Sequence, residues 1–324
     1  MSAPRPLASV SLDLDNLWSY LKVHGDPRWV DRPSYFGVFV PRVLDLLDEL
    51  GMRITFFIVG ADAAAPAHRE VLSEITARGH EVGNHSFEHE SWLHLYPPAR
   101  LVDEIARAED SIFEATGARP LGFRGPGFSW SPQLLEVLAA RGYLFDASTL
   151  PTFIGPLARW YYFRSANLSA EERRTRKMLF GQFRDGFRRL KPHWIALPSG
   201  AGILEIPVTT MPITRAPFHL SYLLYLSRYS EGLRRAYLGT AVRLCAFTGV
   251  EPSYLLHPLD LMGADDVSAL RFFPGMDLAG EPKRRIFHET MTTLKSQFEL
   301  VPMSVHARAI LARGVTVGRA PAVR

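Results

Sequence analysis

Cysteine is almost absent from this chain of 324 residues, which contains only Cys245. A single thiol excludes an intrachain disulfide framework and a zinc site made of cysteines, and it is compatible with a reducing compartment. No uncharged apolar run is long enough to predict a membrane-spanning helix. The N-terminal sequence MSAPRPLASV lacks the basic and apolar regions of a secretory signal. We therefore expect a cytoplasmic protein.

The chain also lacks a strong excess of either charge, because 37 Lys and Arg stand against 33 Asp and Glu, a net charge of +4. This balance predicts no nucleic-acid partner. Residues 156–195 are the exception, with ten basic and three acidic residues. Their mixture of basic and aromatic side chains is typical of a surface that contacts anionic lipid, here at the inner face of a membrane, or a phosphate-bearing ligand. A helical lid packed on the protein is the alternative interpretation.

The remaining composition, 47% apolar and 22% charged, is ordinary for a globular protein and excludes disorder and coiled coil. Short apolar runs alternate along the chain with segments of helical periodicity. This alternation predicts a parallel sheet with right-handed helical crossovers. The seven predicted strands are 7–15, 53–60, 80–85, 121–125, 143–148, 203–209 and 253–257.

Seven strands favour an α/β barrel or near-barrel over an open doubly wound sheet, for which no GxGxxG or P-loop motif is present. Residues 151–202 interrupt the alternation between strands five and six. They are too long for a simple connection, and we predict a mostly helical insertion. Residues 1–310 are predicted to form one domain, followed by a loose C-terminal tail at 311–324.

Polar residues occur where five of the predicted strands end. Because the C-terminal ends of parallel barrel strands meet at the face that carries active sites, we expect these side chains to converge. They are Asp13 and Asp15, His85 and His89, Arg124, Asp146, and His257.

His85 and His89, four residues apart in NHSFEH, can point to one side of a helical turn and share a metal ion. A carboxylate from Asp13 or Asp15 would complete a ligand set of two imidazoles and one oxygen. Such a set leaves coordination positions of the metal open for water and substrate. The other aspartate would then accept a proton from water. The alternatives are two ordinary loop histidines and a solvated strand end.

Two further segments suit the same chemistry. In GFRGPGFSW, Arg124 can keep a neighbouring carboxylate ionised, and Gly125 and Gly127 can present a backbone N–H to an oxyanion. In YLLHPLD, His257 can act as a general acid. The alternatives are an ordinary turn with a surface arginine and a histidine satisfied within the core.

Together these motifs resemble, in order, the five motifs of the NodB-homology polysaccharide deacetylases, carbohydrate esterase family 4. The resemblance covers roughly residues 7–150 and 200–300. The first motif is SLDLDN, an Asp-x-Asp variant of the usual adjacent aspartates, and the others are NHSFEH, RGPGF, DAS and LLH. The resemblance implies a deformed (β/α)7 barrel, in agreement with the strand count.

For the metal and the base, the resemblance implies that Asp13 is the catalytic base and that Asp15, His85 and His89 bind one divalent ion. Zinc is the expected ion, and cobalt, iron and manganese also suit two histidines and one aspartate.

For the other motifs, the resemblance implies that Arg124 braces the base and that the Gly127 N–H faces the oxyanion. Asp146 is the fourth-motif residue, Leu255 would contact the acyl methyl group, and His257 would be the general acid.

The implied function is metal-dependent removal of an acetyl or formyl group from the nitrogen of an aminosugar. The basic, aromatic segment 156–195 favours a lipid-linked glycan or glycolipid as substrate. Asp-x-Asp variants also occur in family members that act on small molecules, so a hydrolase of cyclic imides or linear amides is the second hypothesis. A non-catalytic carbohydrate- or lipid-binding barrel is the third.

Overall fold

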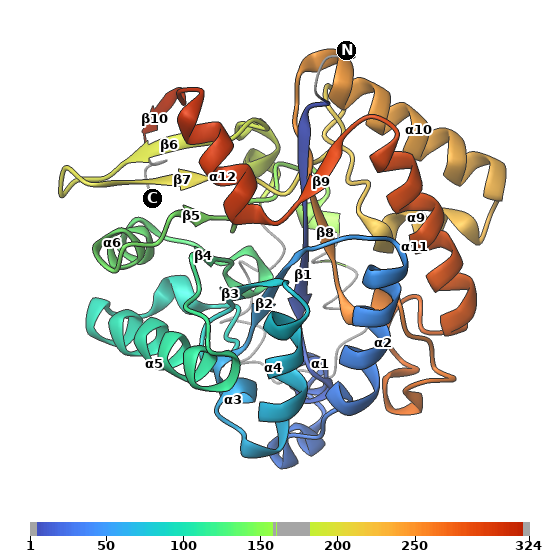
Figure 1. Ribbon diagram of the computed structural model, residues 1–324, viewed down its shortest axis with the longest axis horizontal. Coiled ribbons are helices and arrows are strands. Elements are labelled where there is room, and N and C mark those ends of the chain that lie inside the picture. Colours follow the sequence, from blue (N-terminus) through green and yellow to red (C-terminus); the bar gives the residue numbers. More distant parts are fainter. Residues whose placement is uncertain (1–4, 158–159, 161–181, 320–324) are drawn as a thin grey trace.

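The computed structural model describes residues 5–157, 160 and 182–319. Seven strands form a parallel, curled sheet in the order β7-β5-β4-β3-β2-β1-β8 (Figure 1). Each overlaps a predicted segment, so the predicted α/β barrel is confirmed. Their bounds are β1 Leu7–Leu14, β2 Thr55–Ile58, β3 Glu81–Asn84, β4 Gly122–Phe123, β5 Phe145–Asp146, β7 Gly202–Glu205 and β8 Ser253–Leu256.

The two outer strands of this series, β7 and β8, share no ladder, and this is where the barrel is deformed. The chain just beyond β7 nevertheless reaches β8. The backbone N–H of Thr209 donates to the carbonyl of Ser253 at 3.0 Å, and the N–H of Ser253 donates to Oγ1 of Thr209 at 2.8 Å. Residues that follow β7 therefore lie beside the start of β8.

Helices surround the sheet and separate its strands along the chain (Figure 1). The stretch over 220–248 forms two helices, because Ser230 starts a new one by accepting a hydrogen bond from Leu233 N. The helix bounds are α1 Leu17–His24, α2 Phe36–Glu49, α3 Gly60–Ala63, α4 Arg69–Ala77, α5 Pro98–Thr116, α6 Pro132–Ala140, α9 Leu220–Ser227, α10 Glu231–Thr248, α11 Gly280–Lys295 and α12 Met303–Ala312. None of the helices within the described ranges is long and apolar enough to cross a membrane.

Large side chains fill the space enclosed by the sheet. Phe57 on β2 and Phe145 on β5 are completely buried and belong to one apolar cluster. Each packs over a glycine of a neighbouring strand: a Cβ at Gly83 would come within 2.5 Å of Phe57 Cδ1, and one at Gly122 would collide with the Phe145 ring. This close packing makes a rigid frame for the residues at the strand ends.

Three strands were not predicted from the sequence. They are β6 His193–Ala196, antiparallel to β7, β9 Glu299–Val301, which pairs with β1, and β10 Val317–Arg319, which pairs with β6.

Two of these strands correct the predictions for the insertion and the tail. The insertion at 151–202 contains a strand, β6, in its described part. Most of the helix predicted there falls on 158–159 and 161–181, which lie outside the described residues. The tail at 311–324 is not loose throughout, because residues 317–319 pair with β6. A strand edge without a partner leaves backbone hydrogen bonds unmade, and this pairing satisfies them.

Candidate active site

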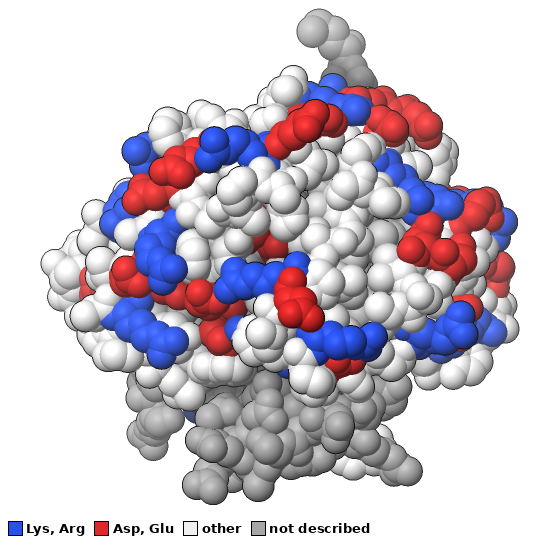
Figure 2. All heavy atoms as spheres, turned by 90° about the horizontal axis from the view of Figure 1, so that it is seen from below, with Lys and Arg blue, Asp and Glu red and all other residues white. Residues whose placement is uncertain are grey.

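The first two site residues stand at the end of β1, which runs toward the lower side of Figure 1. Asp13 is within β1 and Asp15 follows it, and both are buried. Asn16 then caps α1 by accepting a hydrogen bond from Leu17 N, while the Tyr35 hydroxyl donates to the backbone carbonyl of Asp15. These bonds hold the turn that carries Asp15 in one conformation. Figure 2 views the molecule from this side, where basic and acidic residues are intermixed over the described surface.

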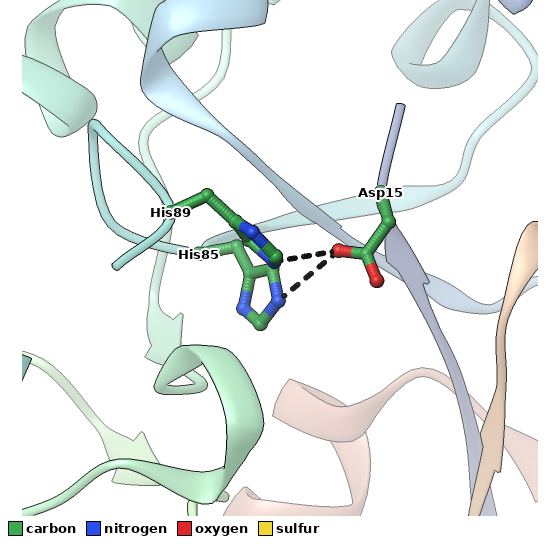
Figure 3. A group of neighbouring side chains, drawn as sticks. All are labelled: Asp15, His85 and His89. Atoms are coloured by element: carbon green, nitrogen blue, oxygen red, sulfur yellow. Dashed lines mark ion pairs between the residues drawn. The ribbon is translucent and has the colours of Figure 1, made fainter. Parts of the chain in front are cut away.

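Asp15 meets the two histidines of NHSFEH (Figure 3). Its Oδ1 lies 2.9 Å from Nε2 of His89 and 3.5 Å from Nε2 of His85. All three residues are buried, and one ligand atom from each lies within 4.8 Å of the others. The structure thus places with the histidines the aspartate that the family resemblance assigned to the metal.

The loop from His85 to His89 is not the helical turn considered from the spacing. Ser86 and His89 have φ values of 62° and 53°, so the chain bends sharply after β3. Glu104 on α5 holds this bend, because its Oε1 accepts hydrogen bonds from Phe87 N at 2.9 Å and Glu88 N at 2.7 Å. The residue that shapes the loop was therefore missed by the sequence analysis.

The protonation of His85 indicates what the three residues can bind. Its Nδ1 lies 2.6 Å from the carbonyl oxygen of Arg124, which can only accept, so Nδ1 carries the proton. In the neutral ring, Nε2 then points a lone pair toward Asp15 Oδ1, a buried atom with no hydrogen-bond partner among the described residues. Lone pairs so close repel each other unless a cation or proton lies between them. The donor set fits a divalent metal ion.

The pKa shifts agree with a demand for positive charge at this position. Burial raises the pKa of Asp15, but His89 and His85 outweigh it and lower the pKa, so the carboxylate stays ionised. Burial lowers the pKa of His85, and the negative charges of Asp13 and Asp15 outweigh it and raise the pKa.

Asp13 is held on one side by Arg124, whose guanidinium is fully buried. Nη1 of Arg124 donates to Asp13 Oδ1 at 2.7 Å and to Ser11 Oγ at 2.8 Å, and Nε donates to the carbonyl of Ala147 at 3.1 Å. A charge-assisted bond of this kind fixes both the charge and the orientation of a carboxylate. On the other side, Asp13 Oδ2 lies 3.9 Å from Nε2 of His257.

His257 has a carboxylate partner that the sequence analysis did not identify. Nδ1 of His257 lies 3.8 Å from Oδ2 of Asp260, which also accepts from His257 N at 2.9 Å, and Ser221 Oγ donates to Oδ1 at 2.6 Å. Burial alone would lower the pKa of His257, but Asp260 and Asp13 raise it to about 9. The signal in the sequence is the carboxylate three residues after the histidine in HPLD, a spacing that a single tight turn brings together.

Asp146 lies on β5 beside Glu205 of β7. Ser148 Oγ donates to Asp146 Oδ1 at 2.6 Å and accepts from Gly125 N at 2.8 Å. Burial raises the pKa of both Asp146 and Glu205. Asp146 thus contacts the RGPG loop through Ser148, which indicates a positioning role, and a direct catalytic role for this fourth-motif residue stays a prediction.

The last two predicted residues are Gly127 and Leu255. Gly127 is exposed in the short turn Pro126–Phe128 and has a φ of 59°, which favours glycine. Leu255 is buried on β8 opposite Ser11 of β1, and strand alternation places it on the same face as His257. Their contacts with an oxyanion and with an acyl methyl group stay predictions.

Comparison with known proteins gives a consistent result. Residues 31–145 match the family described as polysaccharide deacetylase. The peptidoglycan deacetylase of Helicobacter pylori is 26% identical over 162 residues, covering 49% of this chain and 53% of that protein. The chitooligosaccharide deacetylase of a Bradyrhizobium species is 34% identical over 113 residues, covering 35% of this chain and 49% of that protein. The chain thus spans about half the length of these curated relatives.

The fold agrees with a solved structure. A Mycobacterium smegmatis protein assigned as a polysaccharide deacetylase superposes over 100% of both chains with a TM-score of 0.59 and 18% identity. At this identity the likeness concerns the fold. The matched segment and the curated relatives are similar to polysaccharide deacetylases, and the barrel agrees with that fold, so these findings support the resemblance to carbohydrate esterase family 4.

Proposed function

We propose that the protein is a metal-dependent hydrolase that removes an N-acyl group, acetyl or formyl, from an aminosugar. The observation that carries this proposal is the placement of Asp13 beside the cluster of Asp15, His85 and His89, with Arg124 and His257 on either side of Asp13. The family supports the substrate class, because the relatives above are named as deacetylases of peptidoglycan and of chitooligosaccharide.

Asp15, His85 and His89 would hold one divalent ion, with zinc as first choice and cobalt, iron or manganese as alternatives. The ion would supply Lewis-acid chemistry, polarising the acyl carbonyl and increasing the acidity of water. The second ring nitrogen of His85 is already fixed by the Arg124 carbonyl, which orients the ring toward the ion.

Asp13 and His257 carry out the two proton transfers of the reaction. Asp13, held in place by Arg124, accepts a proton from the attacking water as the water oxygen bonds to the acyl carbon. The Gly127 N–H donates to the oxygen that becomes negative. His257 gives its proton to the nitrogen as the carbon–nitrogen bond breaks, leaving the free amine and a carboxylic acid. Leu255 packs against the acyl methyl group.

The complete set of ligand, base and acid residues argues against a barrel that only binds carbohydrate or lipid. A lipid-linked substrate and attachment to an anionic membrane depend on residues 156–195. Of these, 158–159 and 161–181 lie outside the described residues, so both ideas depend on the composition of that segment. The relatives named above support an aminosugar, whichever carrier it is attached to.

The test is a substrate screen with the purified protein in the presence of zinc, cobalt or manganese. We expect acetate or formate, together with a new primary amine, from N-acylated chitooligosaccharides, peptidoglycan fragments or lipid-linked aminosugars. The Asp13→Asn variant and a chelator-treated sample are the controls. Turnover of cyclic imides or simple amides without turnover of any N-acylated sugar would overturn the proposal in favour of the small-molecule hydrolase.

A further inference from the structure

Two polar side chains outside the five motifs lie on segments that follow the neighbours of β8, the strand that leads to His257. Tyr20 is on α1, which follows β1, and His219 directly precedes α9, which follows β7. β8 pairs with β1 on one side and bonds Thr209 beyond β7 on the other. Neither residue belongs to a motif quoted from the sequence.

His219 is buried next to the proposed general acid. The centres of the His219 and His257 rings are 6.4 Å apart, and Tyr222 packs edge-on against His219 at 4.7 Å. Nδ1 of His219 is buried and has no hydrogen-bond partner among the described residues. Burial, with the nearby charge of His257, lowers the pKa of His219 to about 4. The ring is therefore neutral at neutral pH, with one nitrogen to donate and one to accept.

Tyr20 likewise carries a buried polar atom without a hydrogen-bond partner among the described residues. Its ring packs edge-on against Phe273, and its hydroxyl is buried without a hydrogen-bond partner in the described part of the chain. Burial, and then the negative charges of the site carboxylates, Asp15 first, raise the pKa of Tyr20. The hydroxyl is thus a neutral group within electrostatic reach of the active-site aspartates.

A buried polar group without a partner is costly, and native proteins keep few of them. One such group beside the general acid and another near the site carboxylates indicate that a ligand supplies their hydrogen bonds. Both are neutral, so they suit an uncharged hydroxyl, which donates and accepts, better than a phosphate or carboxylate, which Asp13, Asp15 and Asp260 would repel. His257 protonates the leaving nitrogen in the proposed mechanism, so His219 lies where the sugar ring that carries this nitrogen would bind.

Building on the proposed function, we propose that Tyr20 and His219 bind hydroxyl groups of the sugar ring and make the enzyme specific for hydroxylated N-acylamines over simple amides. The two residues form one side of the substrate site, next to the leaving group. They contribute to recognition of the sugar, while the metal, Asp13 and His257 carry the hydrolysis.

The experiment measures kcat/KM for the methyl glycoside of N-acetylglucosamine and for its 3-, 4- and 6-deoxy analogues. Tyr20→Phe removes only the hydroxyl oxygen, and His219→Phe keeps an aromatic ring against Tyr222. We expect each to reduce kcat/KM for the complete glycoside about 10-fold or more. With one of the deoxy analogues, each variant should have the same kcat/KM as the wild type. That analogue already lacks the hydroxyl with which the replaced side chain would bond.

Two further variants separate recognition from structure. His219→Asn, whose amide nitrogen can take the place of Nδ1, should restore part of the loss. Tyr225→Phe is the matched control on α9, because the Tyr225 side chain is exposed and its hydroxyl bonds Tyr229. It should leave all four glycosides unchanged.

Equal losses on the glycoside and on every deoxy analogue would overturn the proposal and make both residues structural. Absence of turnover on all N-acetylated sugars by the wild-type protein would instead contradict the proposed function, and the inference with it.

Discussion

Arg124 and Asp13 form a buried ion pair, with Nη1 of the arginine 2.7 Å from Oδ1 of the aspartate and the guanidinium fully shielded from solvent. Either side chain alone would leave an uncompensated charge at this depth, so each holds the other in place. Oδ2 of the same carboxylate lies 3.9 Å from His257. The pair thus aims a fixed carboxylate at the space between the metal cluster and the general acid.

Replacing Asp13 by asparagine should leave metal binding intact and reduce kcat by ~10²–10⁴-fold, because the amide keeps the shape but does not accept the proton of water. Thermal stability should also fall, since Arg124 loses its buried counter-charge. Metal content, unfolding temperature and turnover are measured on the same sample. Asp103→Asn, at an exposed carboxylate on α5, is the control. Near-normal turnover by the metal-loaded Asp13 variant would show that another residue is the base.

Removing both histidines of the cluster should abolish metal binding. The double variant His85→Ala/His89→Ala keeps only the Asp15 carboxylate, and one oxygen does not retain a divalent ion through dialysis. Elemental analysis after dialysis should give one equivalent of metal for the wild type and for His288→Ala, an exposed histidine on α11. If the double variant still bound one equivalent of metal, the metal site would have to consist of other residues.

Asp260→Asn should shift the alkaline limb of the pH–rate profile toward lower pH. His257 has to be protonated to act as an acid, and its pKa is raised to about 9 by Asp260 and Asp13 against the opposite effect of burial. Activity should therefore fall as pH rises through this pKa, and removal of one carboxylate lowers the pKa. The measurement is kcat/KM against pH, with the exposed Asp277→Asn as control. If the alkaline limb did not move, Asp260 would not be the residue that raises the pKa of His257.

Asp146→Asn should reduce activity less than Asp13→Asn, since Asp146 contacts the RGPG loop through Ser148 and Gly125. We expect Ser148→Ala to reproduce most of its effect, and the double variant to add little, because the two residues hold the same loop. Turnover of the three variants at a fixed metal content tests this. A loss for Asp146→Asn as large as that for Asp13→Asn, with no effect of Ser148→Ala, would restore a direct catalytic role.

Away from the site, Glu251 should make stability depend on acid pH. Burial raises its pKa, but hydrogen bonds from His306 and Arg313 outweigh this and lower it from 4.5 to about 2. A depressed pKa contributes stability above the unfolded value of about 4.5, and the contribution is lost as pH falls toward 2.

Glu251→Gln should accordingly reduce the difference between the unfolding temperatures measured at about pH 6 and about pH 3. Glu281→Gln, at an exposed position on α11, is the matched control and should keep the wild-type difference. An unchanged pH dependence in the Glu251 variant would place the acid-sensitive interaction elsewhere.

Much of this architecture was predictable because it depends on local pattern. Buried apolar runs mark the seven parallel strands, and polar residues directly after them mark one face of the barrel. The start of α6 depends on a local pattern of the same kind, because Ser131 accepts a hydrogen bond from Leu134 N just before Pro132. By contrast, β6 and β10 are short and partly exposed, and their pairing joins segments more than a hundred residues apart. No local sequence pattern therefore predicts these two strands.

The sequence by itself determined which residue types arrive at the catalytic face and in what order, because chain alternation and strand length set where each strand ends. Only the tertiary structure decided their partners. Asp13 and Arg124 are 111 positions apart, and Asp146 meets Glu205 across a strand pair that the insertion separates in sequence. Side-chain pairing depends on distances of a few ångströms between strands, and the barrel, not the spacing of residues along the chain, sets those distances.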